Sequence, residues 1–345
     1  MASSKVKKPK ISILIPCYNE EAMVEKCVLS CLNQTLPADQ IVFVDDCSKD
    51  KTPEILAQYI DRITVLRTPK NTGNKSSAQE YGLQFVTGDI MVTTDADTVL
   101  DPQFIEEIIK EFKDPTVGAA SGYVRSMKYN WLTRCRAFEY SISQNIHKLA
   151  QNYIGFMFVI PGAAAAFRTD IFRQYCTFDH DTITEDLDFT YKIHKAGYKI
   201  GYNRKAVVNT QDPANLHAYR NQLRRWYGGG WQNLLKHFDV ITRPASALEL
   251  SLIYIEGVIL PMMLFVLPLI NLKLALLFFI PYLFNAVLYG ILAAYFESRP
   301  DLMLAPFTYM FLMYINAYIL IEQGIKEVVL RKKNLVWFKP DRVQI

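Results

Sequence analysis

The sequence predicts an α/β fold with a mostly parallel sheet, followed by C-terminal transmembrane helices. In the first half of the 345 residues, apolar runs of strand length alternate with helical segments, and polar side chains follow several of these runs. Alternation of this kind is typical of parallel sheets. Residues 248–325 are mostly apolar with few charges, which is typical of helices that cross a bilayer.

The elements of the first half follow in a regular order. Each strand is an apolar, often β-branched run that stops at polar or turn residues. The predicted strands cover residues 11–16, 40–44 and 63–66, and a fourth runs from residue 90 up to Asp95. The helices between them pass through residues 24–32, start at Thr52 with Pro53 in the first helical position, and cover residues 76–85.

Polar side chains gather where these strands end. In an open parallel sheet, ligands bind outside the carboxyl ends of the strands. Each residue also has an ordinary role available, such as capping a helix or sitting in a solvated loop. Agreement of four loops at one edge nevertheless indicates a binding site. The candidates are Tyr18, Asp45, Asp46, Lys75, Asp95 and Asp97.

Asp95 and Asp97 form the most distinctive pair in this set. Carboxylates two residues apart behind a buried strand point the same way if the strand geometry persists. Mg²⁺ or Mn²⁺ takes one or two such carboxylates together with phosphate oxygens of a substrate. A solvated turn is the alternative reading.

Three later segments add candidates. Residues 131–158 carry apolar side chains at helical spacing and would lie on a membrane surface or cover the sheet. Residues 161–168 are mostly small, which leaves backbone open to a ligand or allows tight packing. Glu185 and Asp186 open a helix, where negative charge is favoured, and Asp186 could instead accept a proton from an attacking hydroxyl.

The stretch 222–226 combines Gln222, Arg225 and Trp226. These side chains supply an amide, a fork that binds phosphate and an aromatic plate that can stack on a sugar or a base. A buried tryptophan beside a surface arginine pair is the alternative.

Composition excludes some functions. The net charge of +4 and the absence of a basic stripe with interleaved aromatics argue against nucleic acid as a partner. Basic clusters at residues 5–10 and 331–333 instead suit anionic lipid or the cytoplasmic side of a membrane. The spacing of the six cysteines predicts reduced thiols in a cytosolic domain, and no signal peptide is expected before Ile11.

Taken in order, these motifs resemble inverting family 2 glycosyltransferases of GT-A fold, in particular the processive membrane synthases of cellulose, chitin, hyaluronan and poly-N-acetylglucosamine. The resemblance extends over nearly the whole chain, and the QxxRW motif at residues 222–226 is its most specific marker. The other markers are the turn at residues 15–20, Asp45-Asp46, Asp95-Ala96-Asp97 and Thr184-Glu185-Asp186.

The resemblance implies a role for each candidate. Asp186, with Glu185 beside it, would be the general base, and Asp95 with Asp97 would carry Mg²⁺ or Mn²⁺. The diphosphate and the acceptor end would be held by Gln222, Arg225 and Trp226. The nucleoside part of a UDP-sugar would be bound by Pro16, Tyr18, Glu20, Asp45, Asp46 and Lys75. The reaction implied is a single displacement at the anomeric carbon, with inversion.

The expected organisation has four parts: a basic tail (1–10), a GT-A domain (11–236), an interfacial helix with about three membrane helices (237–325), and a basic cytosolic tail (326–345). The interfacial helix is expected at residues 233–241 and the membrane spans at 248–269, 272–296 and 303–325. Three crossings would place the basic residues 331–333 outside, so one span is expected to be re-entrant or to lie on the surface. The protein would be a multi-pass plasma-membrane enzyme with its catalytic domain in the cytoplasm.

The expected function is transfer of a hexose, N-acetylglucosamine as first choice, from a UDP-sugar to a growing β-linked glycan. So few helices would not enclose a polymer channel, so association of subunits or an accessory subunit is expected. Two alternatives stay open. One is transfer of a single sugar to a polyprenyl phosphate, and the other is a non-catalytic, membrane-anchored protein that binds nucleotide-sugars.

Overall fold

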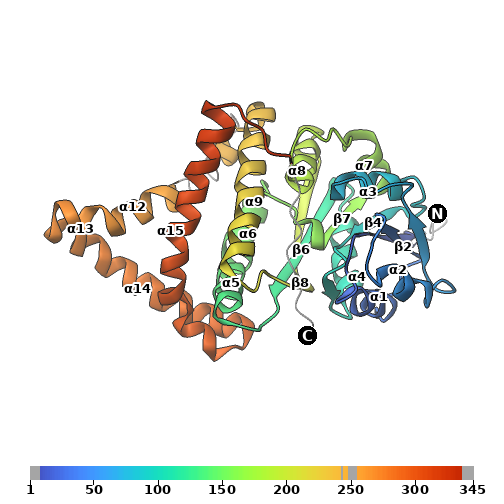
Figure 1. Ribbon diagram of the computed structural model, residues 1–345, viewed down its shortest axis with the longest axis horizontal. Helices are drawn as coiled ribbons and strands as arrows, with labels where there is room; N and C mark the ends of the chain where they lie inside the picture. The colour runs from blue at the N-terminus through green and yellow to red at the C-terminus, as the bar shows by residue number, and fades with distance from the viewer. Residues whose placement is uncertain (1–7, 242–243, 248–254, 336–345) are drawn as a thin grey trace, which may run out of the picture.

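The computed structural model describes residues 8–241, 244–247 and 255–335. Most of the expected N-terminal tail, the last ten residues and part of the first expected membrane span lie outside the described residues. Figure 1 shows a sheet flanked by helices at one end of the molecule and a group of long helices at the other. Between them stands a layer of helices that contacts both.

Within the described residues, eight strands form one sheet in the order β3-β2-β1-β4-β7-β6-β8-β5. Four of the seven pairs are parallel (β1 with β2 and β4, β2 with β3, β6 with β8). The other three, which involve β7 and β5, are antiparallel. The strands are β1 (Ile11–Cys17), β2 (Gln40–Asp45), β3 (Thr64–Arg67), β4 (Ile90–Thr93), β5 (Thr98–Leu100), β6 (Val117–Ser126), β7 (Ala165–Arg168) and β8 (Lys199–Thr210).

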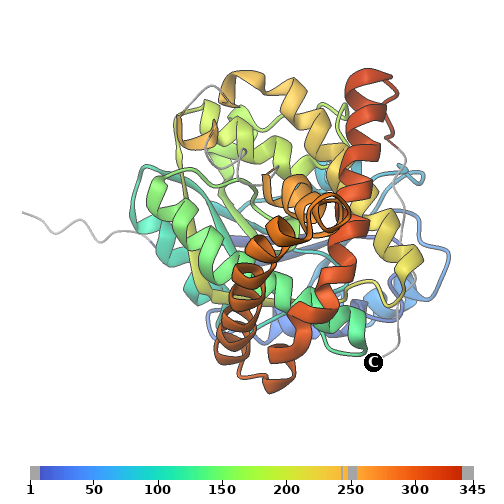
Figure 2. The same cartoon turned by 90° about the vertical axis from the view of Figure 1, so that its left-hand side faces the viewer.

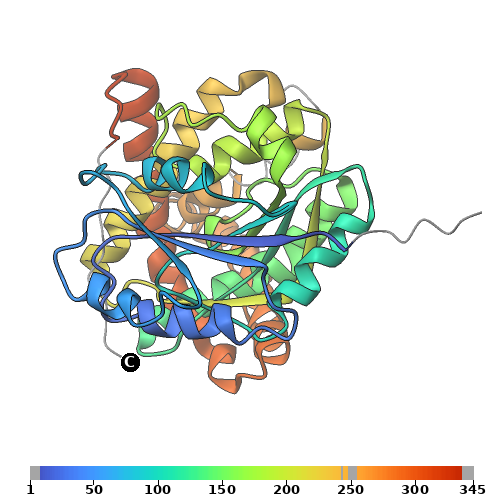
Figure 3. The ribbon, with the colours of Figure 1, turned by 90° about the vertical axis from the view of Figure 1, so that its right-hand side faces the viewer.

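Helices cover both faces of this sheet (Figure 3). Side chains alternate along a strand, so Ile13 of β1 joins the core on one face while its neighbour Leu14 joins the core on the other. The first core contains side chains from α1 (Val24–Leu32), α2 (Thr52–Ala57) and α4 (Phe104–Ile108). The second contains side chains from α3 (Lys75–Leu83), α7 (Thr169–Tyr175) and α8 (Glu185–Lys195). Burial on both faces explains why β1 is apolar without interruption.

The middle layer consists of α5 (Trp131–Ile142), α6 (Lys148–Ile154) and α9 (Leu216–Lys236), with a π-helical turn at Ser143–His147 between the first two. This is the stretch that the sequence placed either on a membrane surface or over the sheet. In the structure, α5 contacts β6 on one side and α14 and α15 on the other. It therefore joins the sheet to the C-terminal helices.

The C-terminal helices are α10 (Phe238–Ile241), α12 (Leu260–Phe265), α13 (Leu267–Ile270), α14 (Leu272–Glu297) and α15 (Ala305–Gly324). Among the described residues, two stretches are long and apolar enough to cross a membrane, Leu272–Glu297 and Pro300–Val329. Figure 2 shows α14 and α15 joined at one end by the short 3₁₀ turn Pro300–Leu304.

Two expected elements of this region stay predictions as membrane-associated segments. The first expected span, 248–269, lies partly outside the described residues. Its described part consists of a π-helical turn (Ile255–Ile259) followed by the short helices α12 and α13, each with a proline in its first turn. The expected interfacial helix at 233–241 is likewise not one element. Its first residues belong to α9, and the chain leaves the helix at His237 before α10 begins.

Polar contacts fix the end of α14 to the sheet. The Glu297 carboxylate accepts hydrogen bonds from the Tyr123 hydroxyl and from Nε of Arg125, the latter at 2.8 Å. Both donors are on β6, and the Glu297 side chain is only 4% exposed. An apolar helix of membrane-spanning length is therefore anchored directly to the α/β domain.

Candidate functional site

A cavity of about 440 Å³ opens at the carboxyl ends of β1, β2 and β4. Its lining also includes the start of α8, the middle of α9 and the segment after β8. The cavity brings together twelve of the thirteen residues expected at the site: Pro16, Tyr18, Glu20, Asp46, Lys75, Asp95, Asp97, Glu185, Asp186, Gln222, Arg225 and Trp226.

Asp45 is the expected site residue that does not line the cavity. Its carboxylate accepts a hydrogen bond from the backbone N–H of Ser48 at 3.0 Å and pairs with Arg67 at 2.8 Å. The neighbouring Asp46 does face the cavity. It accepts hydrogen bonds from the hydroxyls of Thr68 and Thr72, at 2.8 and 2.9 Å. The two aspartates therefore shape the loops of the rim.

Lys75 is surrounded by carboxylates. It begins α3, whose N-cap Asn74 accepts the backbone N–H of Ser77. Its Nζ lies 2.5 Å from Oδ1 of Asp95 and 3.4 Å from Oε1 of Glu185. Burial would lower the pKa of Lys75, but the Asp95 and Glu185 carboxylates outweigh burial and hold the pKa above its usual value. The Lys75 amine is therefore protonated and positively charged within the cavity.

The first three residues of the small run at 161–168 line the cavity beside Lys75. Hydroxyls of Thr93 and Thr94 at the end of β4 donate to the carbonyls of Gly162 and Ala163, at 3.2 and 2.9 Å. A Cβ atom at Gly162 would lie 2.7 Å from Nζ of Lys75. The absence of a side chain there leaves room for the lysine at the cavity floor.

Asp186 is a carboxylate of the cavity whose acidity is changed by its surroundings. It sits in the first turn of α8, and its Oδ1 accepts the backbone N–H of Leu187 at 2.9 Å. Burial and the adjacent Glu185 carboxylate raise the pKa of Asp186 to about 6, although Lys75 and Arg225 oppose the rise. A carboxylate with such a pKa can accept a proton near neutral pH.

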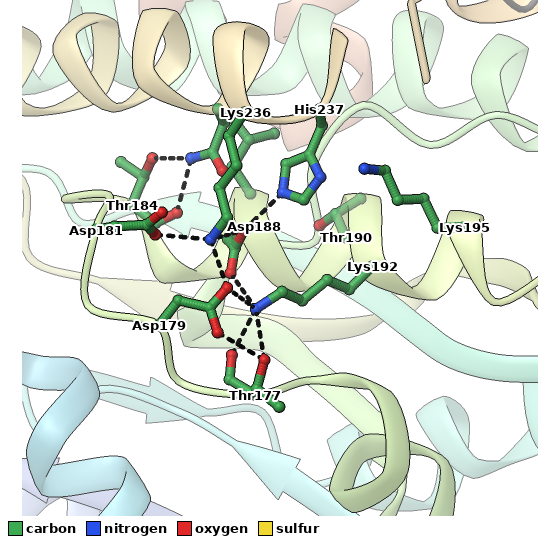
Figure 4. A network of polar contacts seen from close by, with 12 residues as sticks. Thr177, Asp179, Asp181, Thr184, Asp188, Thr190, Lys192, Lys195, Lys236 and His237 are labelled. Carbon is green, nitrogen blue, oxygen red and sulfur yellow. Dashed lines mark hydrogen bonds and ion pairs between the residues drawn. The ribbon is translucent and has the colours of Figure 1, made fainter. Parts of the chain in front are cut away.

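A network of charges joins α8 to the end of α9 (Figure 4). At its centre is Asp188, which is only 3% exposed. It lies two residues after Asp186, so the two side chains leave α8 on nearly opposite faces. Its Oδ2 pairs with Lys192 at 2.8 Å, and its Oδ1 pairs with Lys236 at 2.9 Å and with Nε2 of His237 at 2.6 Å. The cations and their hydrogen bonds lower the pKa of Asp188 against the effect of burial. The helix with Asp186 and the helix with QxxRW are thereby held in fixed register.

A close approach of backbone reinforces this junction. A Cβ atom at Gly229 would lie 2.5 Å from Cγ2 of Thr184, whereas a Cβ atom at Gly230 would meet nothing within 4 Å. Nδ2 of Asn233 donates to the carbonyl and the hydroxyl of Thr184, at 3.2 and 3.0 Å. Glycine at position 229 therefore lets α9 pack directly on the residue that precedes Glu185.

Three residues beside the QxxRW motif were not identified from the sequence. Tyr140 and Asp212 line the cavity, and Arg136 lies behind them with a fully buried side chain. Asp212 follows β8, so it obeys the same strand-end rule that pointed to Asp95. Arg136 gives no such signal, because it is one charged residue among several on α5.

The acidic pair suits a divalent cation. The cavity lining includes both Asp95 and Asp97, and Asp97 accepts a hydrogen bond from the Thr98 hydroxyl at 3.1 Å. No group of three or more His, Cys, Asp or Glu side chains gathers as a metal site in the part of the chain that the structure describes. Two hard oxygen donors are what Mg²⁺ or Mn²⁺ uses when substrate phosphates supply further ligands. The donor set therefore fits a cation that binds with its substrate.

Comparison with known proteins shows which families the chain is similar to. Residues 12–176 match the family model described as glycosyl transferase family 2. Poly-beta-1,6-N-acetyl-D-glucosamine synthases of Staphylococcus epidermidis and Staphylococcus aureus are 29% identical to the chain over 232 residues. The match covers 66% of this chain and 56% of each relative, so the chain matches little more than half the length of these proteins.

The fold has a relative among solved structures. A mannosyltransferase from Pyrobaculum calidifontis, solved in complex with GDP-Man and Mn²⁺, superposes with a TM-score of 0.66 at 21% identity. The superposition covers 95% of this chain and 89% of the other. Most of the C-terminal helices are thus included in the shared architecture.

Proposed function

We propose that the chain is an inverting, metal-dependent glycosyltransferase that transfers a hexose from a nucleotide-sugar to a glycan, because residues 12–176 match the model of glycosyl transferase family 2. The proposed donor is a UDP-sugar, with UDP-N-acetylglucosamine first, and the proposed product is a β-linked oligosaccharide or polysaccharide made processively. One observation carries the proposal. A carboxylate suited to proton transfer, Asp186, lines the same cavity as the acidic pair and the QxxRW side chains.

In the proposed reaction, an acceptor hydroxyl attacks the anomeric carbon of the donor. The new bond from the acceptor oxygen forms as the bond to the diphosphate oxygen breaks, and the hydroxyl proton passes to the Asp186 carboxylate. With its pKa near 6, this carboxylate is ionised at neutral pH and ready to accept the proton. Attack from the face opposite the leaving group inverts the anomeric centre.

The donor end of the cavity offsets the charge that develops on the leaving diphosphate. Arg225 presents a guanidinium fork and Lys75 a second cation, both suited to phosphate oxygens. Mg²⁺ or Mn²⁺ held by Asp95 and Asp97 would supply further positive charge to the diphosphate. Tyr18, Glu20 and Asp46 line the remaining rim, where the nucleoside would bind.

The proposal includes a membrane setting. The two long apolar stretches would embed the enzyme in the plasma membrane, with the catalytic unit of residues 11–236 on the cytoplasmic side. Two such helices among the described residues are few for a polymer channel, so subunits would associate or an accessory subunit would complete the path.

A second candidate is transfer of a single sugar, mannose included, to a polyprenyl phosphate. The mannosyltransferase solved with GDP-Man superposes on 95% of the chain, C-terminal helices included, and this favours mannose as the sugar of this candidate. The staphylococcal synthases, in contrast, extend well beyond the region they share with this chain. The test therefore includes GDP-mannose and a lipid phosphate.

The test measures nucleoside diphosphate release by the full chain in detergent with Mn²⁺ or Mg²⁺. The donors are a panel of UDP-sugars and GDP-mannose, and the acceptors are a β-linked oligosaccharide and a polyprenyl phosphate. We expect turnover with one donor and at least a hundredfold loss in Asp186→Asn. Asp61→Asn, the same change at an exposed residue, is the control and should keep full activity.

The product separates the two candidates. A ladder of oligosaccharides on a sizing gel supports polymer synthesis, and a single lipid-linked sugar supports the second candidate. If no donor is turned over with either acceptor, although a nucleotide-sugar still binds, the non-catalytic binding protein is the better account.

A further inference from the structure

A buried arginine lies directly behind the tryptophan of the QxxRW motif. The Arg136 side chain is 0% exposed. Its Cζ atom is 4.9 Å from the ring centroid of Trp226, 4.6 Å from that of Tyr140 and 5.4 Å from that of Tyr219. A guanidinium within about 6 Å of an aromatic ring is attracted by the ring electrons, most strongly where water is excluded.

Three polar groups hold the guanidinium in its orientation. Nη1 of Arg136 lies 2.5 Å from Oε2 of Glu139, and Nη2 donates to the Tyr140 hydroxyl at 2.8 Å. That hydroxyl donates in turn to Oδ1 of Asp212 at 3.0 Å, and Nε of Arg136 lies 3.5 Å from the same oxygen. Two carboxylates therefore balance the buried cation, as a charge in a protein interior requires.

The rings around the Arg136 guanidinium also connect it to the C-terminal helices. Tyr219, one of the three rings, donates its hydroxyl to Oδ1 of Asn316 on α15 at 2.7 Å. Next to Arg136 on α5, Cys135 packs in a cluster with Leu312 and Ile319 of α15. The position of Arg136 is thus set by α5, α9 and α15 together.

From this geometry we propose that Arg136 is a positioning residue for the acceptor: its guanidinium fixes the plane of the Trp226 ring on which an acceptor sugar stacks. Trp226 lines the cavity and Arg136 does not, so Arg136 would act on a bound saccharide through Trp226. The inference rests on the proposed function, since it takes the acceptor to be a saccharide. A purely structural role, in which Arg136 only stabilises the helix layer, is the competing account.

The test measures binding of two ligands to the full chain in detergent by calorimetry: UDP with Mn²⁺, and a β-1,6-linked N-acetylglucosamine trimer added to the UDP complex. Arg136→Lys keeps the charge but loses the planar fork and the stacking face. We expect it to weaken trimer binding about tenfold and to leave UDP binding unchanged. Arg220→Lys, an exposed arginine on the same helix as Trp226, is the matched control.

A double-mutant cycle separates positioning from a structural role. If Arg136 acts through Trp226, Arg136→Lys has little further effect on trimer binding in a Trp226→Ala background. Full additivity of the two losses would overturn the proposal, as would equal trimer binding by Arg136→Lys and the parent chain. Failure of the parent chain to bind the trimer would also overturn it, while turnover with another acceptor would leave the glycosyltransferase proposal standing.

If Arg136→Lys folds poorly, Tyr140→Phe, which removes the hydroxyl between Arg136 and Asp212, is expected to weaken trimer binding selectively.

Discussion

The acidity of Asp186 gives a prediction that the pH dependence of turnover can test. Burial and the Glu185 carboxylate raise the pKa of Asp186 to about 6. The base acts only when it is ionised, so the rate should fall as pH drops through this value. About nine tenths of the carboxylate is ionised at pH 7 and about one tenth at pH 5. We therefore expect kcat/KM of the parent enzyme to be about tenfold lower at pH 5.

Glu185→Gln should shift the acid limb of the pH profile, which is the fall in kcat/KM at low pH, in a defined direction. A negative neighbour disfavours ionisation of Asp186, so its removal lowers the Asp186 pKa and moves the limb to lower pH. The ratio of rates between pH 7 and pH 5 should then lie below ten, and it would approach one if the pKa returned to its ordinary value of 3.8. Asp186→Asn should be inactive throughout, because the amide cannot accept the proton.

The assay is initial-rate nucleoside diphosphate release between pH 5 and pH 8, with donor affinity measured at each pH so that binding effects are separated from chemistry. Glu54→Gln, an exposed glutamate of α2, is the matched control and should keep the parent profile. An unchanged acid limb in Glu185→Gln, or a limb that moves to higher pH, would refute the assignment of Asp186 as the titrating base.

Three further predictions follow from the cavity and its supports. Lys75→Met removes a cation that lowers the pKa of Asp186, so the acid limb should move to higher pH in the same assay; an unmoved limb contradicts this. Chelation with EDTA should abolish turnover and added Mn²⁺ should restore it, whereas turnover that survives the chelator excludes a required cation. Gly229→Ala should lower the melting temperature and the activity, because its Cβ atom would clash with Thr184. Gly230→Ala, with nothing within 4 Å, should cause neither change, and equal behaviour of the two variants would refute the packing argument.

The sequence was most informative where one strand carries one unbroken apolar run. The first two strands were predicted to within a residue or so of β1 and β2. The α/β class and the resemblance to family 2 glycosyltransferases are confirmed by the comparisons. The strand β8 was not predicted, because its apolar pattern is interrupted by the polar residues Lys199, Asn203, Arg204 and Lys205. Without that strand, nothing indicated that Asp212 stands at a strand end.

The limits of sequence reasoning have a physical cause at Arg136. Its side chain is buried because an aromatic residue of α9 and a carboxylate after β8, roughly eighty positions further along the chain, close over it. A single arginine on a helix with mixed composition gives no hint of such partners. Antiparallel β7 was not predicted for a related reason: it is short, and its buried Ala165 and Ala166 have low strand propensity, although it pairs with β4 and β6 on both sides.

The bonds from Glu297 to β6 bear on how the enzyme would work at a surface. A catalytic domain on a loose linker samples many distances from its membrane, and its acceptor must meet it by diffusion. Here the last residue of α14 is bonded to Tyr123 and Arg125 within the sheet, so the cavity sits at one fixed height above the helix. For the proposed membrane enzyme, this fixed distance between the cavity and α14 would limit which acceptors reach the cavity from the membrane. In the proposed reaction, only an acceptor long enough to span that distance would reach Asp186.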